Sequence, residues 1–278
     1  MNEEAKKLLL DIAMCDELSK ARTDKFHPCY KIVHYQDDLS AFQIPEPWNG
    51  DIENAEILFI SSNPSIDMTE KEDYPQMLWN ENKKTYQLKG KWTEKDVECF
   101  FANRLKSDEY KKRMKSENKT DGTQYWYRSR MVAAELLDMK LDDDRLEDYY
   151  CYTEIVHCKS KNEEGVCEAC KKCFSKSTIK IINLAKKVKY IIVVGRKAQK
   201  QFDIIKREYD LDKVFEEKKI KVIYSYAPRW WGMAKPKPAG VEKITREVYI
   251  EHFIRPHKKS MNDSGPIFAD LNELQTRR

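Results

Sequence analysis

Short apolar runs that end in turn-forming residues recur along the chain, and they predict the buried strands of a parallel sheet. The first is Ile57–Ile60 (ILFI), which stops at the small and turn-forming residues SSNPS. Tyr190–Val194 (YIIVV) is the cleanest run, and a glycine follows it. Tyr149–His157 and Lys221–Tyr226 are rich in β-branched and aromatic residues, which favour strands. We therefore expect four strands.

Segments with apolar residues at helical spacing lie between these runs. One of them begins with a capping box formed by Thr93 and Asp96. Strands that alternate with helices are typical of an α/β fold, in which a parallel sheet carries helices on both faces. We expect Asp67–Tyr86 to be a loop. The expected helices cover residues 1–21, Thr93–Leu105, Thr123–Met139, Glu163–Val188, Lys197–Tyr209 and Val241–Ile254.

Length and composition fit one large α/β domain or two small ones, because the chain has 278 residues of which 41% are hydrophobic. Charged residues make up 35%, and no apolar run approaches the roughly 20 residues that span a bilayer. The acidic start of the chain predicts an amphipathic helix and not a signal peptide. We expect a cytoplasmic protein with an N-terminal segment (1–44), an α/β domain (45–254) and a polar C-terminal tail (255–278).

The charge distribution permits a nucleic-acid partner without requiring one, because the net charge is only +4. Lysine and arginine gather in Arg104–Lys119, Lys159–Lys189 and Lys218–Lys237. Basic surface near a site would neutralise phosphates. Solvated helix faces with mixed charge are the alternative, and for Arg104–Lys119 this interpretation is favoured.

Asn63 is the first candidate for chemistry, because ligands of open α/β sheets sit just past the carboxyl ends of strands. Pro64 fixes its own φ angle and biases Asn63 away from helix, so the turn would hold the amide stiffly. An ordinary strand-ending turn is the alternative, since serine, asparagine and proline favour turns.

Four segments in order resemble the uracil-DNA glycosylase superfamily. ISSNPS resembles the Gly-Ile-Asn-Pro-Gly motif, and TEIVHCKS resembles the second-strand segment of the iron–sulfur branch. AKKVKYIIVVGRKA is similar to a later strand segment of that branch, and SYAPRWW occupies the place of the His-Pro-Ser loop. The resemblance covers roughly Glu46–Gly232. It implies a three-layer αβα sandwich with a four-stranded parallel sheet, and an enzyme that flips a base out of DNA and hydrolyses its N-glycosidic bond.

The resemblance also implies roles for individual residues. Asn63 would position the attacking water through its amide carbonyl, assisted by backbone donors near Ser62 and Ser65. Tyr74 matches an aromatic residue that limits or stacks on the base, and Phe101 (or its neighbour Phe100) would supply another face. Helical spacing favours a core role for the two phenylalanines as the alternative.

Glu154 stands where the family has a base-reading asparagine. An ionised glutamate only accepts hydrogen bonds, which suits the amino group of cytosine and not the N3–H and O4 pair of uracil. A protonated Glu154 would remove this distinction. A strand-end glutamate that pairs with a lysine or arginine is an equally weighted alternative.

The last segment departs from the family because its catalytic histidine is absent, with Ser225 or Tyr226 in its place. Arg229 or His157 would then assist departure of the base. Trp230 and Trp231 stand where the family inserts a wedge into DNA, and apolar wedges are what duplex distortion requires. The expected DNA-binding residues are Arg229, Trp230, Trp231 and Lys159.

Eight cysteines in a chain expected to be cytoplasmic favour reduced thiols or metal ligands over disulfides. Cys158 and Cys173 match two cluster ligands of the iron–sulfur branch, and Cys15 and Cys29 are the upstream candidates for a 4Fe–4S cluster. Zinc held by Cys158, Cys167, Cys170 and Cys173 is an alternative. Residues six apart point to different sides of a helix, which disfavours it. Structural thiols without metal are the third interpretation.

The combined hypothesis is a monofunctional DNA glycosylase that excises a modified cytosine from foreign, phage DNA. A repair glycosylase for uracil or deaminated bases is the first alternative, and a non-catalytic nucleic-acid-binding domain is the second. DNA is the expected partner and a membrane is not. A monomer is favoured, although the sequence leaves the oligomeric state open.

Overall fold

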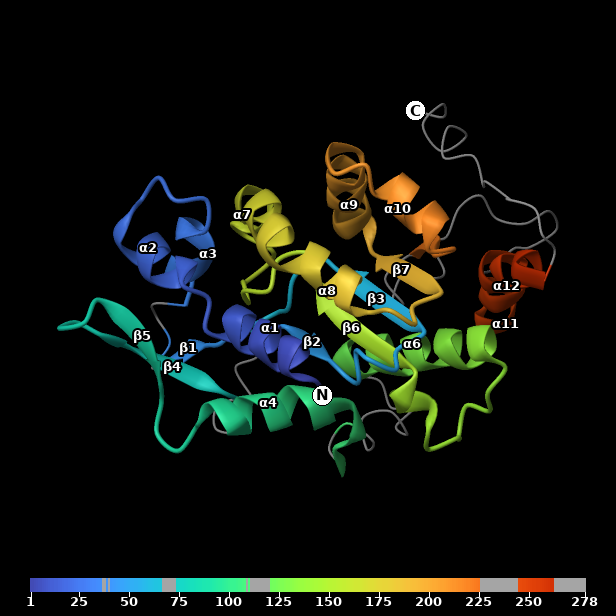
Figure 1. The fold of residues 1–278 in the computed structure, drawn as a ribbon, viewed down its shortest axis with the longest axis horizontal. Helices are drawn as coiled ribbons and strands as arrows, with labels where there is room; N and C mark the ends of the chain where they lie inside the picture. Colours follow the sequence, from blue (N-terminus) through green and yellow to red (C-terminus); the bar gives the residue numbers. More distant parts are fainter. Residues whose placement is uncertain are drawn as a thin grey trace.

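The computed structural model describes residues 1–36, 39, 41–66, 74–108, 110, 121–225 and 245–262. Within them the main sheet has five strands in the order β2-β6-β3-β7-β8 (Figure 1). Four of these run parallel, and the short β2 pairs antiparallel with β6. The expected α/β class is confirmed. The strands are β2 (Trp48–Asn49), β6 (Tyr150–Glu154), β3 (Ile57–Ser61), β7 (Tyr190–Val194) and β8 (Lys221–Ser225).

The sheet differs from the expected four strands because β2 is only two residues long and carries no strand pattern of its own. A second, three-stranded antiparallel sheet has the order β1-β4-β5 and lies beside α2 (Glu17–Thr23) and α3 (Tyr30–His34) (Figure 1). The expectation of a loop over Asp67–Tyr86 is therefore wrong for its described part. These strands are β1 (Phe42–Gln43), β4 (Gln76–Asn80) and β5 (Thr85–Leu88).

Alternate residues of the parallel strands feed two separate apolar cores. Leu58, Cys151 and Val193 belong to the core that packs against α1, which we call the α1-side core. Phe59 and Tyr152 belong to the α6-side core on the opposite face. Helices thus cover both faces of the sheet. On the α1 side these are α1 (Glu3–Ala13), α4 (Glu94–Asn103), α7 (Val166–Cys173), α8 (Ile179–Leu184), α9 (Arg196–Glu208) and α10 (Leu211–Glu217), and on the other side α6 (Asp121–Leu137), α11 (Arg246–Tyr249) and the π-helical η5 (Ile250–Ile254).

The helix expected over Glu163–Val188 is present as one run with a π-helical turn in the middle. This turn, η3 (Phe174–Thr178), joins α7 to α8. The capping box of α4 is confirmed, because Thr93 and Asp96 bond to each other's backbone. Two 3₁₀ turns, η1 (Arg104–Lys106) and η2 (Leu146–Asp148), complete the connections.

The chain after 254 does not begin as a tail, since α12 (Arg255–Asn262) continues the last helix. Arg255 pairs with Glu135 of α6 at 2.7 Å, and Lys221 donates to the His257 carbonyl at 2.7 Å. These contacts hold a polar helix that no apolar pattern predicts. None of the helices in the described residues has the length and apolar composition that crossing a bilayer requires.

The parallel register brings the carboxyl ends of β3 and β6 level with each other. Ser61 lies opposite Glu154, the last residue of β6. The ladder continues beyond the strands, because Ile155 donates to the Ser61 carbonyl at 2.9 Å and Val156 to the Ser62 carbonyl at 3.0 Å. We call this end of the two strands the β3–β6 rim.

Candidate functional site

Asn63 lies just past β3 at the β3–β6 rim, and hydrogen bonds from its side-chain nitrogen hold the amide in place. That nitrogen donates to the Pro64 carbonyl at 2.8 Å and to the Ser160 hydroxyl at 2.9 Å. The amide oxygen is buried and has no hydrogen-bond partner among the described residues. Because the two donor bonds fix the orientation of the amide, the carbonyl oxygen is left as a fixed acceptor.

The turn that carries Asn63 is tied to the segment after β6. Ser65 forms a parallel bridge with Ser160, and the Ser160 N–H donates to the Pro64 carbonyl at 3.2 Å. The Ser62 hydroxyl donates to Glu163, whose carboxylate also pairs with Lys197 of α9. Ser62 is therefore engaged with Glu163, whereas Ser65 is exposed.

Glu154 ends β6 at the same rim, and its Oε2 atom is buried without a hydrogen-bond partner among the described residues. Burial, together with the negative charges of Glu46 and Glu163, raises the pKa of Glu154 well above its ordinary value. This shift favours the protonated carboxyl group, which carries both a donor and an acceptor. It disfavours the ionised, acceptor-only Glu154 that the comparison with cytosine assumed.

Tyr125 of α6 completes the rim, and the sequence reasoning gave it no role in the site. Its hydroxyl lies 2.7 Å from the Ser61 hydroxyl, and its ring lies 5.8 Å from Tyr152 and 5.1 Å from Trp126. Burial first, and then the charge of Glu154, raises the pKa of Tyr125. The aromatic cluster at the start of α6 was the visible signal, but the sequence did not show that this helix end reaches β3.

Tyr74 and Phe101 lie in the α1-side core, on the other face of the sheet from Tyr125 and Tyr152. Both side chains are at most 1% exposed, and their ring centroids are 6.2 Å apart. The Tyr74 hydroxyl donates to the Ile44 carbonyl at 3.0 Å. Neither ring is placed to stack on a base at the rim, because both are packed inside the domain. Phe101 is therefore a core residue, as the alternative drawn from its helical spacing expected.

Lys159 is 1% exposed, and its ammonium lies 3.2 Å from Oε1 of the buried Glu46. Arg104 approaches the same carboxylate at 3.1 Å. Burial opposes ionisation of Glu46, but Arg104 and Lys159 hold its pKa at about 2. Lys159 is thus one partner of an internal ion pair and not a surface contact for phosphate, because its charge is directed inward.

His157 is also internal. Its Nδ1 lies 2.7 Å from the Glu46 carbonyl oxygen, and burial lowers the pKa of His157 to about 4. The ring is neutral near pH 7 and is bound inside the domain, so it does not replace the missing histidine of the fourth strand.

Ser225, at the end of β8, is 4% exposed, and its hydroxyl lies 2.6 Å from the Tyr249 hydroxyl. Ser225 and Tyr226 are the two residues expected in the place of the family's histidine, and Ser225 faces the α6-side core through its contact with Tyr249. Tyr226 and the expected DNA-binding residues Arg229, Trp230 and Trp231 lie outside the described residues.

Four cysteines that are far apart in the sequence come together between the N-terminal segment and the end of β6. Burial raises the pKa of the Cys158 thiol well above its ordinary value, and Cys173, Cys29 and Cys15 raise it further. The pKa of Cys29 is raised to about 12, chiefly by burial and then by Cys15. The His157 N–H donates to the Cys173 sulfur at 3.4 Å. We call this set the thiol cluster.

The thiol cluster is the set expected for a 4Fe–4S centre. Burial raises the pKa of Cys15, Cys29 and Cys173, and the positive charge of the nearby Lys176 opposes this rise without cancelling it. Cysteine thiolates, an N–H donor to sulfur and nearby positive charge fit such a centre. The zinc alternative fits less well, because Cys167 is exposed and Cys170 is only partly buried.

No group of three or more histidine, cysteine, aspartate or glutamate side chains in the described residues is arranged so that it could hold a metal ion.

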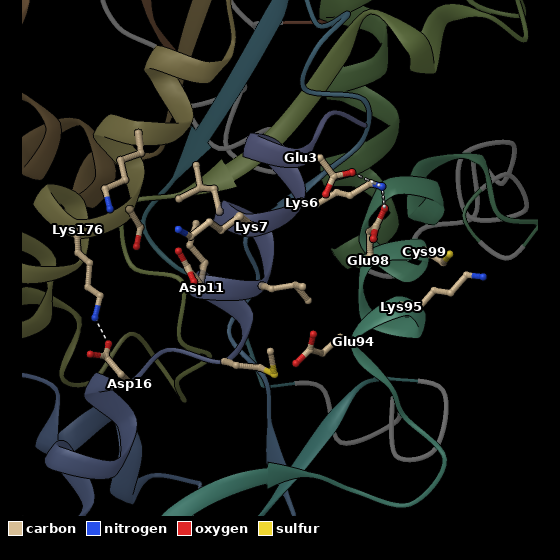
Figure 2. Close-up of a pocket in the computed structure, with 16 residues that line it drawn as sticks. Glu3, Lys6, Lys7, Asp11, Asp16, Glu94, Lys95, Glu98, Cys99 and Lys176 are labelled. Carbon is tan, nitrogen blue, oxygen red and sulfur yellow. Dashed lines mark hydrogen bonds and ion pairs between the residues drawn. The ribbon is translucent and has the colours of Figure 1, made fainter.

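A groove of about 1040 Å³ lies away from the rim, between α1, α4 and the π-helical turn. Figure 2 shows that its walls carry charged side chains of both signs, among them Lys6 between Glu3 and Glu98, and Lys176 paired with Asp16. None of its lining residues holds a buried polar atom without a partner. The unsatisfied oxygens of Asn63 and Glu154 make the rim the better candidate site.

Comparison with protein-family models finds no match to this chain, and comparison with curated protein sequences finds none either.

Proposed function

We propose that this protein is a DNA glycosylase of the uracil-DNA glycosylase superfamily that hydrolyses the N-glycosidic bond of a modified cytosine and leaves an abasic site. One observation carries the proposal: Asn63, just past β3, and Glu154, at the end of β6, each hold a buried oxygen that has no partner among the described residues at the same rim. An unpaired buried polar atom costs about 1–3 kcal/mol. A ligand that bonds to both oxygens would recover this free energy.

Asn63 would orient the attacking water. Its nitrogen is bound to Pro64 and Ser160, so the free carbonyl oxygen is the atom that would accept a hydrogen bond from water. An amide is too weak a base to deprotonate water, and its role is to position the molecule against the sugar. This role suits a reaction in which the sugar develops positive charge before water adds.

Glu154 would read the base. A neutral carboxyl group donates one hydrogen bond and accepts another, so it fits the N3 and amino group of cytosine. Ser225, in the place of the family histidine, is bound to Tyr249, which supports a departure from uracil chemistry. A cell cannot safely excise normal cytosine, so a modified cytosine of foreign phage DNA is the substrate we propose, and defence is the corresponding role.

A uracil or deaminated-base repair glycosylase is the second candidate. The raised pKa of Glu154 supports it as well, because a protonated carboxyl group would accept from N3–H and donate to O4 of uracil. The proposal also assigns the DNA wedge to Trp230 and Trp231, with Arg229 beside them. It places the protein in the cytoplasm, where thiols stay reduced.

We further propose that the thiol cluster, Cys15, Cys29, Cys158 and Cys173, holds a 4Fe–4S centre. Such a centre would tie the N-terminal segment to the end of β6. Its proposed role is structural, and no step of base excision depends on it.

A panel of duplex and single-stranded oligonucleotides, each with one modified base, tests the function. The panel includes uracil, hypoxanthine, 5-hydroxymethylcytosine and glucosylated 5-hydroxymethylcytosine, and alkaline strand breakage reports the abasic site. We expect release of a modified cytosine by the wild type and a loss of at least about 100-fold in Asn63→Ala, the scale of removing one oriented polar group. Asn183→Ala, at an exposed position, is the matched control.

The outcomes separate the candidates. Release of uracil with no release of any modified cytosine would select the repair glycosylase. DNA binding that is equal in the wild type and Asn63→Ala, without release of any base, would leave a non-catalytic DNA-binding domain.

A further inference from the structure

Three carboxyl groups gather near the β3–β6 rim, and their surroundings differ. Glu46 is paired with Arg104 and Lys159, and Glu163 is paired with Lys197. Glu154 has no basic partner among the described residues, although Glu46 and Glu163 both act on it electrostatically. Glu154 is therefore the one carboxyl of this described group that is placed to keep its proton.

The side chain of Glu154 lies on the face of the sheet where Tyr125 stands. Glu154 follows Tyr152 by two residues in β6, so both side chains lie on the α6 side of the strand. Tyr125 is bonded to Ser61, the residue opposite Glu154 in the register. A base that stacked beside Tyr125 would present its polar edge to Glu154.

We propose that Glu154 is the catalytic proton donor, which delivers its carboxyl proton to ring nitrogen N3 of a cytosine-type base as the bond to the sugar breaks. The inference rests on the proposed function and extends it by naming the acid. It gives Glu154 the task that the family assigns to the missing histidine, which is to stabilise the departing base.

The step balances in atoms and charge. As the C1′–N1 bond breaks, its electron pair passes to the base. In the same step the Glu154 O–H bond breaks and an N3–H bond forms, so the base leaves as a neutral molecule and Glu154 becomes a carboxylate. The water held by Asn63 adds its oxygen to C1′ and releases a proton to solvent, from which Glu154 regains its own.

This chemistry selects the base. Cytosine and its 5-substituted forms carry a lone pair on N3 that can take a proton, whereas N3 of uracil already carries hydrogen. An unprotonated cytosine would have to leave as an anion, which costs more free energy than departure as a neutral base. A buried acid at this position thus assists the departure of cytosine-type bases and not that of uracil.

The proton on Glu154 also predicts the pH dependence of the reaction. Burial, Glu46 and Glu163 all raise the pKa of Glu154, and Tyr125 is a further titratable group beside it among the described residues. The active form is the protonated one. The rate should therefore be highest below the elevated pKa of Glu154 and should fall as the pH rises through it.

Single-turnover base release from a duplex with one 5-hydroxymethylcytosine, measured against pH, tests the proposal in the full-length protein. We compare the wild type with Glu154→Gln, Glu154→Asp and the exposed control Glu164→Gln. General acid catalysis contributes about 10²–10⁴-fold, so Glu154→Gln should lose at least about 100-fold, and its rate should not fall at high pH. Glu154→Asp should restore part of the rate together with its fall at high pH.

A 3-deazacytosine duplex supplies a second, mutation-free arm, because its ring has carbon in place of N3. The wild type should release it as slowly as Glu154→Gln releases the 5-hydroxymethylcytosine base. Thermal unfolding of the variants controls for misfolding.

Two results would overturn the proposal in distinguishable ways. A wild-type protein that releases no base from any substrate defeats the proposed function and this inference with it. A wild type that releases the modified cytosine, with Glu154→Gln within about threefold of it or with the same fall at high pH, defeats the proton donor alone.

Discussion

The ammonium group of Lys159 lies 3.7 Å from the ring centroid of Tyr74 and 3.2 Å from the carboxylate of Glu46. All three side chains are buried. A buried cation is tolerated only where a carboxylate and an aromatic face replace its water. The three side chains therefore form one unit that joins the segment after β6 to the segment before β2, beneath the β3–β6 rim.

Replacing Lys159 with methionine should destabilise the protein by about 3–5 kcal/mol, since it leaves Glu46 buried with one cation fewer. Lys161→Met, two residues away and exposed, should change the free energy of unfolding by less than about 0.5 kcal/mol. Urea unfolding of both variants measures the difference. Equal midpoints would mean that Arg104 alone satisfies Glu46.

Glu46 should make the protein sensitive to acid. Burial opposes its charge, yet Arg104 and Lys159 hold its pKa at about 2, below the value near 4.5 that an unfolded chain would have. The group binds fewer protons when folded, so its contribution of about 3 kcal/mol is complete above pH 4.5 and is lost as the pH falls to 2. Unfolding midpoints between pH 6 and pH 2 test this. In Glu46→Gln the midpoint should be lower at pH 6 and should vary less with pH.

Gly165, which precedes α7, should not tolerate a side chain. Its φ angle is +75°, and an added Cβ would lie 2.7 Å from the backbone nitrogen of Ile32. Gly90 has a φ angle of +65° with nothing within 4 Å, so Gly90→Ala isolates the backbone strain of about 1–2 kcal/mol. Gly165→Ala should cost at least about 1 kcal/mol more, because it also overpacks the contact with α3. Equal losses in urea unfolding would mean that α3 moves aside freely.

The thiol cluster predicts a coloured protein. After anaerobic purification we expect a broad absorbance near about 400 nm and about four irons per chain. Cys15→Ser or Cys158→Ser should remove most of both signals. Cys99→Ser and Cys167→Ser, at exposed positions, should leave them unchanged.

The same variants distinguish zinc from a cluster. If Cys158, Cys167, Cys170 and Cys173 held zinc, Cys167→Ser would lower the metal content and Cys15→Ser would not. A colourless, metal-free wild type would leave reduced structural thiols as the remaining interpretation.

β3, β6 and β7 were predictable because each is a buried run with a turn after it, and β8 because it is rich in β-branched and aromatic residues. β4 and β5 were not, since their residues are mostly half-exposed and the turn between them lacks an Asn-Gly signal. In that turn Lys84 takes the positive φ angle, 51°, that glycine usually supplies.

The candidate site was predictable where it depends on strand order and unpredictable where it depends on distant partners. Asn63 and Glu154 follow from the ends of two strands, and the register places them at one rim. Lys159 resembles a surface lysine in the sequence, because its partner Glu46 lies far away along the chain. Tyr125 was missed for the same reason, since its contact with Ser61 depends on how α6 crosses the sheet.

The π-helical turn Phe174–Thr178 lets the continuous helix α7–α8 contact both the N-terminal segment and the end of β6. Just before it, Cys173 is turned toward the N-terminal thiols, and within it Lys176 is turned toward Asp16. At its end, the Thr178 hydroxyl donates to the Glu154 carbonyl at 3.1 Å. The wider winding shifts the helical phase between these contacts, as π turns do. Deleting one residue from this turn would rotate every later side chain by roughly 100°. The hydrogen bond from Thr178 to Glu154 would then be lost, while Cys173, which precedes the turn, would keep its position.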